Sequence, residues 1–535
     1  MSRSLGTDDR DLSAKPKELG FGANAARNVL SWFVPALVAL IVVPITVRGL
    51  GPDAYGLLAL VGALTGYLHL MELGLGSAVV RYLSYYRALN EGRPMLGILR
   101  FALTWFGGAG VIGCVILVAG AEWFAGSLLD VPADLLPTAV VVIRITGFGF
   151  LMGMFTSVGA VIPMTFLRYD ISAWATIVFG TLGSVGPAVL VTLGYGLVAL
   201  SLFSLATSLL AIVFYTIVTV RLFKPIDLSA GPSWRSIRRK TFRFAGLAAL
   251  NSIHSTVASQ TSRVIVGVAS GVAAAAYYQV PWMLANRVNT MLGRAAYVIF
   301  PTASGMKARH DEEGISRLYL RPSRLFFSVN GSASMAMCAL AYPLLRYWVN
   351  ADYATEGSMA LVIFTLTQAV NATTMAASQL NMSAARPGVN LTFAISNSAV
   401  SLATVYPLTV RWGVTGAALS GLLGAANVPA FFWYVHKHIT HMSSRRVWRE
   451  CYRPTVLANV PIGVAVYLLL TPRVSTLLEA LLAFALASLL GMVGSGLLGA
   501  IKREDLRSSW EVAKGLWPRR KPPAGTAEPS ADDAA

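Results

Sequence analysis

Long apolar runs alternate with short polar segments along most of this chain. Each run has about 18–28 residues, which is the length that an α-helix needs to cross a bilayer. The pattern therefore predicts an all-α polytopic membrane protein with about 14 transmembrane helices. The predicted spans are residues 29–49, 55–77, 98–120, 137–162, 171–193, 197–219, 244–269, 272–300, 325–345, 357–381, 389–410, 414–435, 454–471 and 476–500.

Composition supports this interpretation. Of the 535 residues 55% are hydrophobic and only 13% are charged, whereas a soluble domain carries about 25% charged residues. The first apolar run begins near Asn28, behind a polar segment with charges of both signs. That run is too long for a signal peptide and lacks a small-residue cleavage site, so we expect the polar tail to stay attached.

The basic residues predict the orientation of the spans. If the N-terminus is cytoplasmic, 35 of the 43 Lys and Arg residues fall in cytoplasmic tails and loops. Cytoplasmic loops of membrane proteins are enriched in Lys and Arg, so both termini are expected in the cytoplasm. Four basic residues fall at outer positions and four inside apolar spans. The outer four are Arg48, Arg346, Arg411 and Arg473.

Charge and cysteine usage narrow the function classes. The net charge of +18 lies mainly in short loops, so it indicates topology and lipid contact rather than nucleic-acid binding. The three cysteines and six histidines form no cluster with metal-ligand spacing, and no phosphate-binding Walker motif is present. We therefore expect no metal, no cofactor and no catalytic residues.

Two hairpins resemble each other at an interval of 219–220 residues. In both, a proline precedes a glycine-containing turn and an Ala-Leu-Ser start of the next helix. The paired positions are Pro187 and Pro407, Gly194 and Gly413, Gly196 and Gly416, and, at an earlier turn, Gly51 and Gly271. Membrane hairpins use Gly and Pro in any case, but the shared interval favours a repeat of six helices.

A repeat of six helices gives two bundles of the same orientation, with the substrate expected between them and access alternating by rocking. The predicted organisation is a cytoplasmic N-terminal tail (1–27), a first six-helix bundle (28–220), a basic linker (221–243), a second six-helix bundle (244–438), a basic loop with two extra helices (439–500) and a cytoplasmic, partly disordered tail (501–535).

Four arginines lie inside apolar spans: Arg144, Arg263, Arg287 and Arg294. An arginine at a helix centre costs about 2.5–3.5 kcal/mol on insertion scales, and its charge persists at every accessible pH. The spans offer almost no carboxylate to pair with them, since Glu72 lies near one span end. A net positive interior suits a phosphate-bearing or acidic substrate, because guanidinium binds phosphate through two hydrogen bonds.

Polar side chains accompany these arginines at helical spacing. Thr290 shares a face with Arg287 and Arg294, and similar stripes mark the seventh and tenth spans. Such residues either line a lumen or hydrogen-bond between helices, and the second role is the more common for a single amide. The candidate substrate-binding residues are Arg144, Arg263, Arg287, Arg294, Asn251, His254, Gln368 and Asn371, and Glu72 is the candidate for ion coupling.

The first hairpin carries three short motifs: Arg27-Asn28-Val-Leu, Arg48-Gly-Leu-Gly-Pro-Asp-Ala-Tyr-Gly and Glu72-Leu-Gly-Leu-Gly-Ser-Ala-Val-Val-Arg-Tyr. In order and spacing they resemble the Wzx/RfbX-type polysaccharide flippases of the multidrug/oligosaccharidyl-lipid/polysaccharide exporter superfamily, over roughly residues 25–500. The resemblance implies a MATE-like V-shaped arrangement of the two bundles and a cationic lumen. Members of the family often carry an aspartate where Arg263 stands here.

The resemblance implies export of an anionic polyprenyl-pyrophosphate-linked oligosaccharide, such as an O-antigen or exopolysaccharide repeat unit, across the bacterial cytoplasmic membrane. Membrane lipids, a polysaccharide polymerase and a chain-length regulator are the implied partners, and no nucleic acid. The alternatives are a murein lipid precursor flippase, a multidrug/cation antiporter of the same fold, or a membrane glycosyltransferase or polymerase. An antiporter needs lumenal carboxylates, and an enzyme needs acidic catalytic residues and usually a large outer domain, which this sequence does not offer.

Overall fold

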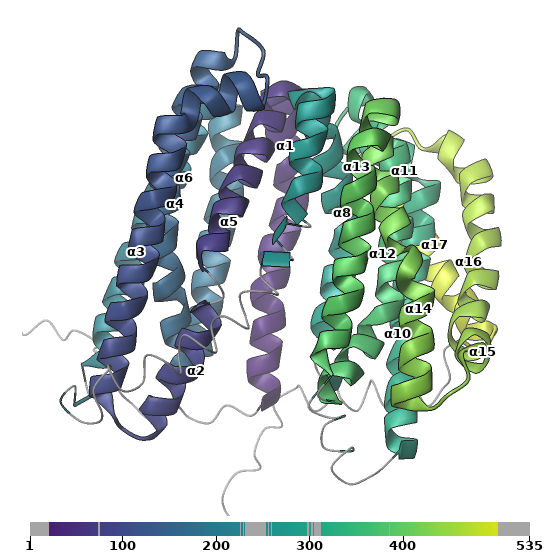
Figure 1. The fold of residues 1–535 in the computed structure, drawn as a ribbon. Helices are drawn as coiled ribbons and strands as arrows, with labels where there is room; N and C mark the ends of the chain where they lie inside the picture. The colour runs from purple at the N-terminus through teal and green to yellow at the C-terminus, as the bar shows by residue number, and fades with distance from the viewer. Residues whose placement is uncertain are drawn as a thin grey trace, which may run out of the picture.

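The computed structural model describes residues 21–72, 75–224, 226–227, 229, 253–254, 256–257, 259–296, 299–300, 303, 306, 312–384 and 386–500. These residues form helices joined by short turns, and no strand occurs among them. Figure 1 shows α2–α6 on one side of the molecule and the helices from α8 to α17 on the other, with α1 between the two groups. The predicted all-helical fold class is confirmed.

The first half of the described chain is built from six labelled helices. They are α1 (Phe21–Leu68), α2 (Leu75–Ala88), α3 (Gly92–Glu122), α4 (Leu136–Thr165), α5 (Tyr169–Thr192) and α6 (Leu197–Phe223), with short 3-10 and π segments at His69–Glu72 and Trp123–Leu128.

The second half begins with helical residues 259–270, which carry no label in Figure 1. It continues with α8 (Val272–Ala296), α10 (Glu312–Ala339), α11 (Ala341–Trp348), α12 (Ala351–Ser383), α13 (Pro387–Gly424), α14 (Val428–Val435), α15 (Ser444–Val447), α16 (Arg453–Ala465) and α17 (Leu477–Leu497).

The predicted number of spans agrees with this order of helices. Nine helices of the described part are long and apolar enough to cross a membrane, or ten if the bent pair α10–α11 is counted as one. Two of these, Leu37–Glu72 and Gly388–Thr440, each contain two predicted spans joined at a break. Helix α8 and residues 259–270 supply the remaining two of the 14. Arg287 and Arg294 lower the hydropathy of α8.

Four glycines mark the turns that the sequence pairs as repeats. Gly51 and Gly271 have φ angles of 79° and 88°, and Gly194 and Gly413 have 83° and 55°. A side chain disfavours such left-handed backbone, so glycine is required where two helices reverse direction within one or two residues. The equivalent geometry agrees with the predicted repeat, while the residue limits of the two bundles stay a prediction.

The ninth predicted span, 325–345, is not one straight helix. The chain bends by 73° between α10 and α11, at Leu340. Leu340 and the adjacent Ala341 are buried in a core that also contains Val47 of α1 and Val266. The first part of α1 therefore packs with the second half of the chain as well as with its own bundle.

Arg48 joins the two halves of the molecule at the end where Gly51 lies, which we call the Gly51 end. Its Nε donates to the carbonyl of Val349, and its Nη2 donates to Tyr347 O at 2.6 Å and to Trp348 O at 3.0 Å. In return, Trp348 Nε1 donates to Leu40 O at 2.8 Å. These carbonyls end α11, so the guanidinium satisfies acceptors that the helix leaves unpaired.

A close backbone contact adds to this junction. A Cβ atom at Gly56 would lie 2.0 Å from the carbonyl oxygen of Val272, so only glycine allows α1 to approach the start of α8. Further along α1, the hydroxyl of Tyr67 lies 2.5 Å from Thr261 Oγ1. The second part of α1 thus packs along residues 259–272 over about three helical turns.

Candidate functional site

Two arginines lie part-buried within the second half of the chain. Arg263 is on helical residues 259–270 and Arg287 is on α8. The Nε atom of each is buried and has no hydrogen-bond partner among the described residues. A buried charged donor is stabilised by an oxygen acceptor, so each of these Nε atoms is suited to bind an anionic group.

Aromatic side chains surround the arginine pair. The guanidinium carbon of Arg263 lies 5.9 Å from the ring centroid of Trp282, a distance at which a cation interacts favourably with the ring face. Tyr55 of α1 lies within electrostatic range of both Arg263 and Arg287. It also packs against the core of the second half, so one tyrosine of the first bundle reaches the arginines.

The prediction that the intramembrane arginines lack carboxylate partners is confirmed for Arg263 and Arg287 within the described part of the chain. It is wrong for Arg144, whose Nη2 lies 3.0 Å from Glu122 Oε1. Both side chains are exposed, at 46% and 78%. Helix α3 continues to Glu122, which carries this carboxylate to the level of Arg144 on α4. The pair is a surface ion pair and not part of a buried anion site.

Arg294 differs from Arg287 although both lie on α8. Its side chain is exposed and belongs to the last turn of the helix, where a cation interacts favourably with the helix dipole. Thr290, between them, donates its hydroxyl to Asn286 O at 2.9 Å. The buried pair of the structure is thus Arg263 and Arg287, from neighbouring helices, rather than two arginines on one helix.

Gln368 takes part in hydrogen bonds between helices. Its Oε1 accepts from Asn289 Nδ2 at 3.0 Å, and its Nε2 donates to Asn286 Oδ1 at 3.1 Å. Asn330 of α10 donates to the main-chain carbonyl of Gln368 at 3.2 Å. This network ties α8, α10 and α12 together, so the side chain of Gln368 is occupied in packing, the alternative that the sequence left open.

The other polar candidates do not belong to this amide network. His254 Nε2 is 2.9 Å from Ser398 Oγ of α13, which is a contact between helices. Asn371 is part-buried on α12, and its side chain makes no hydrogen bond to a described residue. Asn251 lies outside the described residues.

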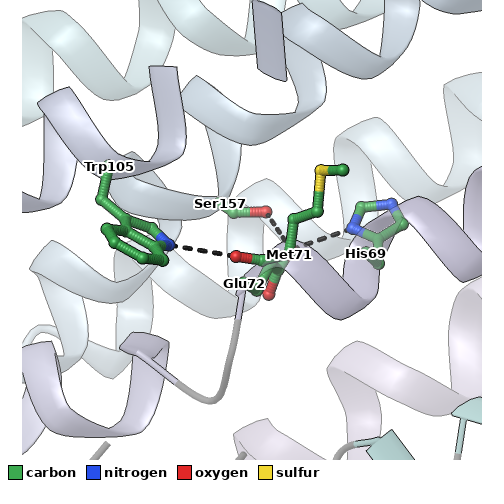
Figure 2. A network of polar contacts seen from close by, with 5 residues as sticks. All are labelled: His69, Met71, Glu72, Trp105 and Ser157. Atoms are coloured by element: carbon green, nitrogen blue, oxygen red, sulfur yellow. Dashed lines mark hydrogen bonds and ion pairs between the residues drawn. The ribbon is translucent and has the colours of Figure 1, made fainter. Parts of the chain in front are cut away.

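Glu72, the coupling candidate, sits at the end of the second predicted span in the first bundle (Figure 2). Its Oε1 lies 2.9 Å from His69 Nδ1 and accepts a weaker contact from Ser157 Oγ at 3.4 Å. Beside it, Trp105 Nε1 donates to Met71 O at 3.0 Å, which fixes the main chain at this turn. The carboxylate is thus held by one serine and one histidine among the described residues.

A cavity of about 510 Å³ lies within the first bundle, between α1, α4, α5 and α6. His69 and Tyr55 are the ionisable residues of its described lining, which holds no Lys, Arg, Asp or Glu. Tyr55 lines the cavity, packs against the core of the second half and lies within electrostatic range of the two arginines, so the cavity opens toward the half of the molecule that holds them.

Sequence reasoning missed Tyr55, Trp282 and this cavity. A signal for the cavity was present in α6, where Ser201, Ser204 and Ser208 recur at spacings of three and four residues and share a helix face. Tyr55 belongs to the motif that begins at Arg48, but that motif gives no sign of its contact with the second half, which arises because α1 packs there.

The chain matches the family model described as "Polysaccharide biosynthesis protein" over residues 45–355. Its fold is similar to an inward-facing multidrug resistance MATE family transporter of the MOP superfamily, with a TM-score of 0.66, 16% identity, and coverage of 80% of this chain and 97% of that one. The fold is also similar to the lipid II flippase MurJ in an inward closed conformation, with a TM-score of 0.64 and 11% identity. This match covers 88% of this chain and 97% of that one.

A MOP superfamily transporter from Pyrococcus furiosus gives a TM-score of 0.57 at 16% identity, covering 78% of this chain and 95% of that one. A search of curated protein sequences finds no match. The family match covers more than half of the chain, and the structural likenesses extend over most of it. The chain therefore belongs to the polysaccharide biosynthesis protein family and has the fold of MOP superfamily transporters and flippases.

Proposed function

We propose that this protein translocates an anionic polyprenyl-pyrophosphate-linked oligosaccharide, such as an O-antigen or exopolysaccharide repeat unit, across the bacterial cytoplasmic membrane. The observation that carries the proposal is the Arg263–Arg287 pair, whose buried Nε donors have no acceptor among the described residues. A pyrophosphate supplies several charged oxygens, and guanidinium binds such groups through two parallel hydrogen bonds.

The saccharide and pyrophosphate would cross through the protein while the polyprenyl chain stays in lipid. No bond is made or broken, and access alternates by movement of one bundle against the other. Both termini lie in the cytoplasm in this proposal. Lipid-linked oligosaccharide arrives from the inner leaflet, and a polymerase with its chain-length regulator would use it at the outer leaflet.

Glu72 is the proposed coupling residue. Its contact with His69, which lines the cavity of the first bundle, gives a route by which protonation near the cavity would affect the packing of α1. The matching variant is Glu72→Gln, which keeps the size of the side chain and removes its charge. In proteoliposomes with an imposed pH gradient, Glu72→Gln should lose acceleration by the gradient but keep basal exchange.

Two alternatives remain on the same fold. A murein lipid precursor also carries pyrophosphate, so the arginine pair suits both lipids. A multidrug/cation antiporter is disfavoured because an unpaired guanidinium pair repels a cationic substrate.

The test is translocation of fluorescent lipid-linked repeat unit in proteoliposomes containing the full chain. Arg263→Gln and Arg287→Gln should each slow translocation about tenfold, since a hydrogen bond to a charged group contributes about 1.5–3 kcal/mol. Arg411→Gln is the control, because Arg411 is exposed beside Trp412. Unchanged rates in both arginine variants would refute the proposal, and faster movement of a murein lipid precursor than of the repeat unit would favour that alternative.

A further inference from the structure

The cavity of the first bundle is lined by neutral hydroxyl groups, most of which donate their proton within their own helix. Its lining includes Ser184, Ser201 and Ser208, each of which donates its hydroxyl proton to a carbonyl of its own helix at 3.0 Å. Thr46 and Thr65 do the same at 3.2 Å and 2.9 Å. A hydroxyl has one proton and two lone pairs, so the oxygens keep acceptor capacity for a ligand.

The absence of fixed charge gives the cavity a chemistry unlike that of the arginine pair. Its described lining has no Lys or Arg to bind phosphate and no Asp or Glu to bind a cation. The hydroxyls of Tyr55, Thr146 and Ser204 donate to no described residue, so the lining can donate as well as accept. A neutral ligand rich in hydroxyl groups matches both capacities, whereas a phosphate only accepts and finds no positive charge in this lining. Saccharides carry such groups on nearly every carbon.

The volume and shape of the cavity come from glycine. Gly62, Gly149, Gly153 and Gly183 line it, and a Cβ atom added at any of them would meet nothing within 4 Å. Since these positions abut open space, helix packing does not require glycine there. The cavity volume of about 510 Å³ lies in the range of roughly 300–1,000 Å³ that is common for small-molecule sites.

We propose that this cavity binds the saccharide part of the lipid-linked substrate while Arg263 and Arg287 bind its pyrophosphate. Tyr55 links the two regions, because it lines the cavity, packs against the core of the second half and lies within electrostatic range of both guanidinium groups. That adjacency is what a substrate requires in which the first sugar is bonded directly to the pyrophosphate. The inference rests on the proposed function and adds a separate site for the sugar.

Filling the cavity is the direct test. Gly149→Leu and Gly153→Leu, singly and together, would extend side chains into the open space without meeting a neighbouring residue at Cβ. Leucine also favours helix more than glycine does. Gly108→Leu is the matched control, because Gly108 is an exposed glycine of α3 with open space at Cβ and does not line the cavity.

The measurement is binding to the full-length protein in detergent, followed by native mass spectrometry. The two probes are undecaprenyl pyrophosphate carrying the repeat unit of the producing strain and the same lipid without sugar. We expect wild type and Gly108→Leu to prefer the saccharide-bearing lipid. Gly149→Leu/Gly153→Leu should bind it at least tenfold more weakly and bind the sugar-free lipid as wild type does, which also reports that the variant is folded.

A gentler pair of variants removes acceptors without filling space. Ser184→Ala and Ser201→Ala should each weaken binding of the saccharide-bearing lipid about threefold and leave the sugar-free lipid unaffected. The inference is overturned if the glycine double variant still prefers the saccharide-bearing lipid, or if it binds both lipids more weakly by the same factor. It is also overturned if the lipophilic cation tetraphenylphosphonium occupies the cavity, as shown by binding to wild type that the double variant loses.

The same experiment separates this inference from the proposed function. Arg263→Gln/Arg287→Gln should weaken binding of both lipids, because both carry pyrophosphate. If that variant binds the sugar-free lipid as tightly as wild type, the proposed function fails whatever the glycine variants show. If the arginine double variant binds both lipids more weakly while the glycine double variant still prefers the saccharide-bearing lipid, the anion site is supported and the saccharide site is refuted.

Discussion

Two polar regions inside this molecule differ in charge and in hydrogen-bonding chemistry. The described lining of the cavity in the first bundle has neutral hydroxyls and no Lys, Arg, Asp or Glu, and most of these hydroxyls keep acceptor capacity because they donate to their own helices. The second half holds Arg263 and Arg287, which offer charged donors without acceptors. A substrate with a sugar at one end and phosphates beside it matches both regions. Charged residues alone therefore do not describe all the polar chemistry inside this protein.

Reversing the charge in the donor region should have the largest effect. Arg287→Glu places a carboxylate where we propose that pyrophosphate binds, and like charges in contact cost several kcal/mol. Translocation of the lipid-linked repeat unit should fall by about a hundredfold or more, measured as the initial rate in proteoliposomes. Arg411→Glu, an exposed reversal on α13, should change the rate little. A decrease in translocation rate smaller than threefold for Arg287→Glu would contradict a role of Arg287 in binding the pyrophosphate.

The contact between the two halves of the molecule at the Gly51 end should respond next. Arg48→Gln removes charge-assisted hydrogen bonds to the carbonyls of Tyr347 and Trp348, each worth about 1.5–3 kcal/mol, so opening at this end should become at least about tenfold more populated. Opening can be measured with spin labels at Asp134→Cys and Asp352→Cys, in a variant without the three native cysteines. A longer distance between the two labels would report the opening.

Arg346→Gln is the control for that measurement, because Arg346 is an exposed arginine of α11 that lies over Tyr347. It should leave the distance distribution as in wild type. Equal distributions for Arg48→Gln and Arg346→Gln would show that the Arg48 contacts do not hold the two halves together.

The amide network of the second half should affect stability rather than substrate choice. Gln368→Leu leaves Asn286 and Asn289 without their partner, and a hydrogen bond between membrane helices contributes about 1 kcal/mol. We expect a lower thermal unfolding temperature in detergent with an unchanged preference between saccharide-bearing and sugar-free lipid. A changed preference at unchanged stability would make Gln368 a substrate contact.

The smallest effect is expected at Arg144. Its partner Glu122 is 78% exposed, and an exposed ion pair contributes about 0–1 kcal/mol. Arg144→Gln should alter the translocation rate by less than about twofold, in the same proteoliposome assay. A loss of translocation rate as large as that of Arg287→Gln would show that Arg144 contributes to substrate binding.

Much of the fold could be predicted from the sequence because its signals are local. Apolar runs of bilayer length set the 14 spans, and the turns at Gly51 and Gly271 have the positive φ angles that only glycine adopts readily. Pro343 is a local signal for the bend at Leu340, because it has no N–H for the carbonyl of Ala339, which accepts from Thr471 Oγ1 instead. The size of the bend and the partner of that carbonyl depend on packing against other helices and could not be read from the sequence.

The candidate site was only partly predictable for the same reason. The intramembrane position of Arg263 and Arg287 follows from the sequence, because each lies in an apolar run. The partner of Arg144 does not, because it depends on how far α3 continues beyond its apolar run. Gln368 and Asn371, three residues apart on one helix, illustrate the limit: the first is held in an amide network and the second is not.

If Arg263 and Arg287 form an anion site, inorganic pyrophosphate should bind there. Isothermal titration calorimetry on the purified full-length protein would compare wild type with Arg263→Gln, Arg287→Gln and Arg144→Gln. We expect pyrophosphate to bind wild type and Arg144→Gln alike and to bind each of the other two at least tenfold more weakly. Equal binding to all four proteins, or a loss confined to Arg144→Gln, would contradict such a site.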